Sequence, residues 1–165
     1  MTFRSQTYGN TELRSIPEKL NDYYQKNKHW GTDFQIVIGT DSQNHNDTKM
    51  VTVIAILCEG HGGIFFDHIK HISRISNVKE KLNAETGDSL LVATQLLEVI
   101  ESSEEFDELY MNVPISIHID AGTSPKGKTY SLIKELTGWV TATGFECEIK
   151  PDSFVASSIA DKISK

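Results

Sequence analysis

Three stretches in the first half of the chain have the apolar patterns of β-strands. Phe34–Thr40 places Phe, Ile and Ile on one side and Gln, Val and Gly on the other, which is the two-residue period of a strand. Lys49–Glu59 is apolar almost throughout, as expected for a central strand. Gly63–Ile72 follows after a glycine-rich turn. The short separation predicts that the last two strands form an antiparallel hairpin.

Other stretches of the chain have the apolar spacing of helices. A helix is expected over Ile16–Lys26, with Pro17 in its first turn. A longer helix is expected from about Asn77 to Ser102, and its apolar stripe includes Glu85. The remaining predicted elements are a strand over 113–120, a loop over 121–128, a helix over 129–143 that stops at Gly144, a strand over 145–150 and a last helix capped by Asp152 or Ser153.

The element order from residue 34 onward is β-β-β-α-β-α-β-α. Three hairpin-connected strands followed by alternating helices and strands predict an α/β fold with a mixed five-stranded sheet flanked by helices. Residues 1–33 are expected to form an N-terminal helical lead-in, and residues 34–165 the core. A length of 165 residues is typical of a single domain.

The net charge of −7 is concentrated in one segment. Residues 80–112 hold nine acidic side chains, and Lys81 is the one base among them. Such a segment is usually a solvated helix surface. An acidic chain also disfavours strong non-specific binding of nucleic acid, which depends on Lys and Arg neutralising phosphates. It leaves open a site in which bound cations supply the positive charge.

The sequence has the features of a cytoplasmic protein. Its first residues, Met-Thr-Phe-Arg-Ser-Gln, lack the charged start and apolar stretch of a signal peptide. No apolar run approaches the roughly 18 residues that a membrane-spanning helix needs. We therefore expect a cytoplasmic chain without membrane contact, while the sequence leaves its oligomeric state open.

Four acidic residues lie at positions where a carboxylate is unfavourable for packing but suitable for binding a cation. Asp41 and Asp120 each end an apolar run that predicts a strand, Glu85 lies on the inward stripe of the long helix, and Asp161 lies in the closing helix. A charged side chain on a buried stripe is usually paired or bound to metal. Each acid also has a structural alternative, as a turn cap, a loop start or a surface group, and Asp152 is the alternative to Asp161.

Short motifs across residues 34–165 resemble one known family. They are Ile38-Gly39-Thr40-Asp41-Ser42-Gln43, Asp120-Ala121-Gly122, Gly127-Lys128-Thr129, Gly138-Trp139, Lys150-Pro151-Asp152 and Ala160-Asp161-Lys162. With the element order, these motifs make the chain similar to the ribonuclease H-like superfamily and, within it, to the uncharacterised YkuK-like family.

The resemblance implies a ribonuclease H-like fold and a nuclease that hydrolyses phosphodiester bonds of RNA, DNA or a hybrid. Two Mg²⁺ or Mn²⁺ ions would be held by the four acids Asp41, Glu85, Asp120 and Asp161, with Asp41 bridging both ions. Oxygen ligands of this type suit hard cations. Ser42 and Gln43, from the same motif as Asp41, are assigned to substrate contact. The alternative is a non-catalytic module that binds nucleic acid or a protein partner on the same fold.

A second motif predicts phosphate binding. Gly122–Thr129 reads Gly-Thr-Ser-Pro-Lys-Gly-Lys-Thr and matches the P-loop pattern of nucleotide-binding proteins. The short remainder of the chain disfavours a complete nucleotide-binding core, and Pro125 removes one backbone N–H donor. The favoured interpretation is that Gly122, Thr129 and either Lys126 or Lys128 hold a phosphate of the nucleic-acid backbone. A small nucleotide-binding protein is the second alternative.

His118 precedes Asp120 by two residues, so the two side chains share one face of the predicted strand. This placement allows the imidazole to approach a cation at Asp120. A packed, neutral histidine is the favoured interpretation.

Overall fold

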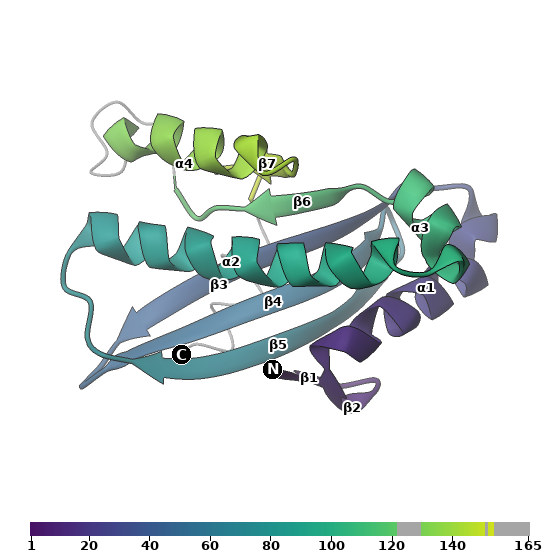
Figure 1. Cartoon of the computed structure of the whole chain (residues 1–165), viewed down its shortest axis with the longest axis horizontal. Coiled ribbons are helices and arrows are strands. Elements are labelled where there is room, and N and C mark those ends of the chain that lie inside the picture. The colour runs from purple at the N-terminus through teal and green to yellow at the C-terminus, as the bar shows by residue number, and fades with distance from the viewer. Residues whose placement is uncertain (122–129, 151, 154–165) are drawn as a thin grey trace.

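The computed structural model describes residues 1–121, 130–150 and 152–153. The strands within these ranges form one mixed sheet in the order β2-β1-β5-β4-β3-β6-β7 (Figure 1). They are β1 (Thr2–Ser5), β2 (Gly9–Glu12), β3 (Phe34–Asn44), β4 (Thr48–Cys58), β5 (Gly62–Ile72), β6 (Ile115–His118) and β7 (Glu146–Glu148).

The three long strands pair as the sequence predicts. β3, β4 and β5 form an antiparallel meander, and β6 and β7 then add to the β3 side in parallel. Asp41 of β3 lies opposite Val51 of β4. On its other side, β3 pairs with β6 only as far as Gly39, which lies opposite His118. Strand β6 therefore stops before the level of Asp41.

The main helices pack on one face of this sheet. Figure 1 shows α2 lying along β3 and β4, with α4 beside it near β6 and β7 and α1 toward the end where α3 lies. The helical elements are η1 (Leu13–Ser15), α1 (Ile16–Asn27), η2 (Lys28–Trp30), α2 (Val78–Glu101), η3 (Glu104–Phe106), α3 (Asp107–Asn112) and α4 (Tyr130–Ala142). Among the described helices, none combines the length and apolar character needed to cross a membrane.

The two faces of the sheet carry different apolar clusters. Ile36, Ile38 and Ile54 point toward the helices and join the main core with Leu20 of α1 and Leu96 of α2. Alternate residues point the other way, and there Val37, Val51 and Val53 form a smaller buried cluster. This alternation fixes which face each polar residue of β3 occupies.

The lead-in differs from the prediction. The helix is present as α1, but residues 2–12 also form the hairpin β1–β2, which extends the sheet to seven described strands instead of five. β1 pairs with β5 beside the ion pair of Arg4 with Asp67, at 2.9 Å. Phe3 is the one large side chain of this hairpin that is fully buried. A four-residue, mostly polar strand gives too little alternation to be recognised from sequence.

Two stretches to which the sequence assigned no element contain regular structure. β3 does not end at Thr40 but continues to Asn44, which pairs with Thr48, so Ser42 and Gln43 are strand residues. The side chain of Asn44 holds this end of the strand. Its Nδ2 donates to the Ile75 carbonyl, and its Oδ1 accepts from Thr48 Oγ1. The acidic segment after α2 forms η3 and α3, whose short apolar stripe includes the buried Phe106 and Leu109.

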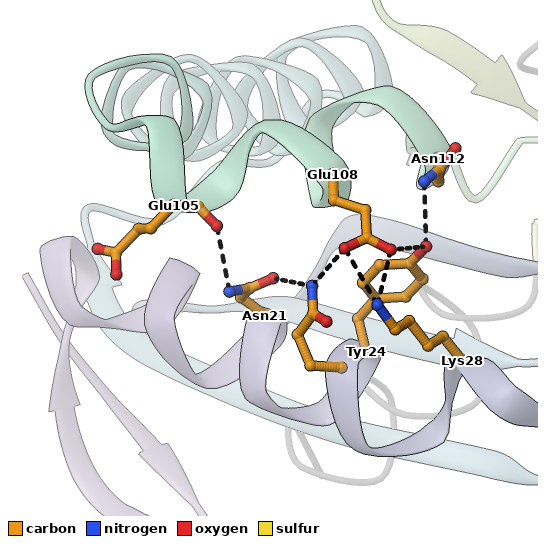
Figure 2. Close-up of polar contacts among 7 residues, drawn as sticks. Asn21, Tyr24, Lys28, Glu105, Glu108 and Asn112 are labelled. Carbon is orange, nitrogen blue, oxygen red and sulfur yellow. Dashed lines mark hydrogen bonds and ion pairs between the residues drawn. The ribbon is translucent and has the colours of Figure 1, made fainter.

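Polar side chains join α1 to α3 (Figure 2). The Glu108 carboxylate accepts hydrogen bonds from Gln25 Nε2 at 2.9 Å and Lys28 Nζ at 2.9 and 3.2 Å. Tyr24 OH lies 3.5 Å from the same carboxylate and accepts from Asn112 Nδ2 at 3.1 Å. Glu108 is thus the common acceptor that connects the N-terminal helix to the acidic segment.

Candidate functional site

Glu85 is a buried carboxylate on the inner face of α2. The helix begins at Asn77, whose side chain accepts from the N–H groups of Lys79 and Glu80, and this cap sets the start of the apolar stripe. Glu85 lies on that stripe and is 5% exposed, as the helix phase predicts. Its Oε1 accepts a hydrogen bond from Ser42 Oγ at 2.5 Å. Through this contact α2 and β3 meet at the candidate site.

Burial raises the pKa of Glu85 to about 7. The Ser42 hydrogen bond opposes this rise, because it favours the ionised form. The negative charge of Asp41 raises the pKa further, Lys81 lowers it, and the charge of Asp120 raises it again. The carboxylates of Asp41 and Asp120 therefore act electrostatically on Glu85, although the three come from different elements.

Asp41 occupies the opposite side of β3 from Ser42. Thr40 and Ser42 point toward α2, since Thr40 Oγ1 contacts Ser89 Oγ at 2.7 Å and Ser42 contacts Glu85. The side chain between them points to the other face. Because β6 ends opposite Gly39, β3 lacks this neighbour at the level of Asp41. An ion at this point would take ligands from both sides of the sheet.

Asp120 follows β6 and pairs with a lysine. Lys150 Nζ lies 2.7 Å from Asp120 Oδ1. Among the described residues Oδ1 has no donor in hydrogen-bond geometry, so the contact is an ion pair of imperfect direction. The side chains of Lys150 and Asp120 are 51% and 23% exposed. The pair is therefore partly open to solvent.

His118 is the last residue of β6 and is 2% exposed. Burial lowers its pKa to about 4, while the charge of Asp152 acts in the opposite direction. The imidazole is therefore neutral at neutral pH, as favoured from the sequence. It lines a small pocket together with Thr40, Glu85 and Asp120. His118 is thus packed in the interior and also lies near Glu85 and Asp120.

The pocket contains an unsatisfied hydroxyl. Thr86, next to Glu85 on α2, is 2% exposed, and within the described ranges its Oγ1 has no hydrogen-bond partner. Buried polar atoms are normally paired with protein or water. Thr86 and Glu85 both line the pocket, but it leaves no room for a water molecule, so the hydroxyl gains a partner there only if side chains move.

A model of the ribonuclease H-like family matches residues 15–165. The chain belongs to this family. It is also similar to the uncharacterised protein YkuK of Bacillus subtilis (strain 168), with 32% identity over 162 residues that cover 93% of this chain and 91% of the relative. No solved structure gives a significant match. The family indicated by the sequence motifs is thus confirmed, and the mixed sheet agrees with its fold.

The residues of this ribonuclease H-like chain suit divalent cations in donor type. Asp41, Glu85 and Asp120 supply hard oxygen ligands, and Thr86 Oγ1 adds a buried polar atom without a partner among the described residues. Across those same ranges, however, no three His, Cys, Asp or Glu side chains lie close enough together to hold an ion. The described residues therefore do not form a complete ion site by themselves, and Glu85 and Asp120 are engaged by Ser42 and Lys150.

Several predicted site residues lie outside the described ranges. These are Asp161, Gly122, Lys126, Lys128 and Thr129. Gln43 is described and, by strand alternation, lies on the Asp41 side of β3. Asp152, the alternative to Asp161, is exposed, and its charge acts on His118.

Lys150 is the residue at this site that sequence reasoning missed. The Lys150-Pro151-Asp152 motif contributed to the family resemblance, but its spacing does not reveal a partner. The signal is the parallel pairing of β6 with β7, in which Ser116 lies opposite Glu146 and His118 opposite Glu148. Beyond this pairing, Lys150 N–H donates to the Ala121 carbonyl at 3.0 Å, which brings Lys150 beside Asp120. Neither segment alone predicts that the two pair.

A larger hollow lies away from these acids. It has a volume of about 760 Å³ and is lined by residues at the start of β3 and the end of β4, including Phe34, Cys58 and Glu59. Asp41 and Asp120 lie toward the other end of β3 and after β6, and neither lines it. Size alone therefore points away from the acid cluster, whereas the buried carboxylate and its charged neighbours point to it.

Proposed function

We propose that this ribonuclease H-like chain is a metal-dependent nuclease that hydrolyses phosphodiester bonds of nucleic acid with two divalent cations. The observation that carries the proposal is Glu85, a buried carboxylate whose pKa is raised to about 7 and is pushed upward by the charges of Asp41 and Asp120. Perturbed carboxylates of this kind are concentrated at functional sites. Family membership supports nuclease-type chemistry.

The proposed ligands are Asp41, Glu85 and Asp120, with Asp161 as the fourth. Mg²⁺ or Mn²⁺ would supply an activated water and stabilise the leaving oxygen. Asp41 is proposed as the ligand shared by both ions. Ser42 orients the Glu85 carboxylate through its 2.5 Å hydrogen bond, and Gln43 is proposed to contact substrate.

The protonation of Glu85 links this site to pH. With a pKa of about 7, Glu85 is protonated in a large fraction of molecules at neutral pH. A cation requires the ionised carboxylate, so Glu85 releases its proton on binding and affinity for cations rises with pH.

Nucleic acid is the proposed substrate, and its approach is restricted by charge. The segment 80–112, with nine acids, repels phosphates. The proposed contacts begin where β3 and β6 end. Gly122, Lys126, Lys128 and Thr129, which follow Asp120 in the sequence, are proposed to bind phosphate. We propose that these residues bind a phosphate of the nucleic-acid backbone rather than a free nucleotide.

The test is cleavage of fluorescein-labelled RNA, DNA, RNA–DNA hybrid and four-way-junction substrates by the purified chain. We expect cleavage with Mn²⁺ or Mg²⁺, none with EDTA, and loss of at least about 100-fold on Asp41→Asn or Asp120→Asn, as expected for removal of an electrostatic catalytic group. Asp107→Asn changes an exposed acid on α3 and is the matched control.

Two outcomes would contradict the proposal. Activity that survives Asp41→Asn at the control level would assign cleavage to another site or a contaminant. Mn²⁺ uptake without cleavage of any substrate, or nucleic-acid binding that is independent of Asp120, would favour the non-catalytic binding module.

A further inference from the structure

Backbone hydrogen bonds hold the segment of Lys150 beside the segment of Asp120. Beyond the last paired residues of β6 and β7, Ile119 N–H donates to the Glu148 carbonyl at 2.9 Å, and Lys150 N–H donates to the Ala121 carbonyl at 3.0 Å. The regular pairing of β6 with β7 ends at His118, and the chain then turns, since Ala121 N–H donates to the Ile119 carbonyl at 2.9 Å. Asp120 lies in this turn, between the two backbone hydrogen bonds that join the segments. The position of Lys150 beside Asp120 is set by main-chain pairing rather than by the ion pair.

The turn after β7 fixes the same segment. The N–H groups of Asp152 and Ser153 both donate to the Ile149 carbonyl, at 2.8 and 3.0 Å. Lys150 therefore lies between two anchored backbone positions, while its side chain remains 51% exposed. The ammonium group reaches the acid cluster and solvent at once.

The ion pair contributes little as a stabilising device. Exposed pairs of this kind add little to stability, and Asp120 Oδ1 receives no well-directed hydrogen bond among the described residues. A lysine ammonium has three donors on a flexible stem, so contact with one carboxylate oxygen leaves donors for another anion. Beside Asp120 it offsets part of the repulsion that this carboxylate exerts on other negative charges.

We propose that Lys150 is a phosphate-binding residue of the acid site, and that it exchanges Asp120 for a non-bridging oxygen of a bound phosphodiester when Asp120 takes up a divalent cation. The proposal rests on the proposed nuclease function. It deepens that function by naming the residue that contacts the substrate phosphate. In the free chain Lys150 contacts the Asp120 carboxylate. In the chain with bound cation and nucleic acid it contacts a phosphate instead.

The experiment has two titrations on wild type, Lys150→Met and Lys150→Arg. Mn²⁺ binding is measured by calorimetry, and binding of a fluorescein-labelled 20-nucleotide RNA and DNA by anisotropy in Ca²⁺ over a series of salt concentrations. Lys134→Met, which removes an exposed lysine of α4, is the matched control. Thermal melting verifies that each variant is folded.

Lys150→Met is expected to bind Mn²⁺ about threefold more tightly, because Asp120 loses its competing cation. The same variant is expected to bind the oligonucleotide about tenfold more weakly, with the slope of log affinity against log salt reduced by about one. Lys150→Arg keeps the charge and is expected to retain oligonucleotide affinity within about twofold. Lys134→Met should match wild type in both titrations.

The outcomes separate the two levels of the proposal. If wild type binds Mn²⁺ and Lys150→Met matches it in both titrations, Lys150 is only a surface ion-pair partner and the inference is overturned while the nuclease proposal stands. If Lys150→Met binds Mn²⁺ more weakly, Lys150 supports the site rather than competing for it, which also overturns the exchange. If wild type takes up no Mn²⁺, the nuclease proposal fails first.

Discussion

Ser42 donates its hydroxyl hydrogen to Glu85 across 2.5 Å and so joins β3 to α2 at the acid site. The hydrogen bond favours the ionised carboxylate, whereas burial and the charges of Asp41 and Asp120 favour the protonated one. The second set of effects is larger, since the pKa of Glu85 is raised from 4.5 to about 7. This balance makes Glu85 a measurable reporter of the site.

Removing the Ser42 hydroxyl should raise the pKa of Glu85 further. Ser42→Ala deletes the donor that stabilises the ionised form, so we expect its titration midpoint to lie above that of wild type. The measurement is a ¹³C NMR titration of the Glu85 carboxyl carbon. Ser89→Ala is the matched control, because Ser89 bonds Thr40 rather than Glu85. A midpoint that is unchanged in Ser42→Ala would contradict the contact.

Glu85 should make the metal-free fold less stable as pH rises. Its pKa is about 7 in the fold against 4.5 in the ordinary state, so the folded chain binds this proton more tightly. The stabilisation is fully present below about pH 4.5 and is lost as pH rises through about 7, a change of roughly 3 kcal/mol. Glu85→Gln should therefore gain about that much stability relative to wild type between pH 4.5 and pH 8.5.

Urea unfolding in EDTA at several pH values measures this difference. Glu98→Gln, which changes an exposed acid of the same helix, should follow wild type. Parallel pH curves for Glu85→Gln and wild type would show that Glu85 titrates normally in the fold.

Divalent cations should restore stability to the wild type at high pH. A ligand that binds only the folded chain stabilises it by about 2.7 kcal/mol at 100 times its dissociation constant. We expect Mn²⁺ at pH 8 to raise the melting temperature of wild type and of Asp107→Asn, and to leave Asp41→Asn nearly unchanged. Equal stabilisation of all three chains would place the cation elsewhere.

Glu108 should control how firmly α1 is held. It accepts from Gln25 and Lys28 (Figure 2), and these contacts lower its pKa. Their stabilising contribution is present above the ordinary pKa of 4.5 and is lost as pH falls through the lowered value. Glu108→Ala is expected to speed amide hydrogen exchange in α1 at pH 7 and to have less effect near pH 3.

Glu105→Ala is the control for α1. The backbone carbonyl of Glu105, not its side chain, accepts from Asn21, so this variant should keep the exchange rates of wild type. Faster exchange throughout the chain in Glu108→Ala would indicate global destabilisation instead of release of α1.

The parts of the fold with one buried face were predictable from sequence. Phe34–Thr40 and the helix stripe that includes Glu85 follow from the periods of strand and helix, because burial dictates every second or every third to fourth residue. The hairpin β1–β2 was missed because Phe3 alone among its residues is a large and fully buried side chain. Periodicity needs more than one such position.

The acidic residues of the candidate site could be predicted from sequence, but the side chains that contact them could not. Asp41, Glu85 and Asp120 are recognisable from where apolar patterns end or include a charge. The contact of Ser42 with Glu85 requires β3 to continue past Asp41, which is decided by pairing with β4 as far as Thr48. The contact of Lys150 with Asp120 depends on the register of β6 and β7, which neither strand specifies alone.

Anomalous scattering from crystals grown with Mn²⁺ at pH 8 would locate the cations that we propose at Asp41, Glu85 and Asp120. We expect two peaks about 3.5–4 Å apart, with Asp41 between them and Glu85 and Asp120 as ligands. Lys150 Nζ should no longer lie 2.7 Å from Asp120 Oδ1. Peaks at other acids, or an acid cluster that retains both the Ser42–Glu85 and the Lys150–Asp120 contacts with no Mn²⁺ beside it, would contradict the proposal.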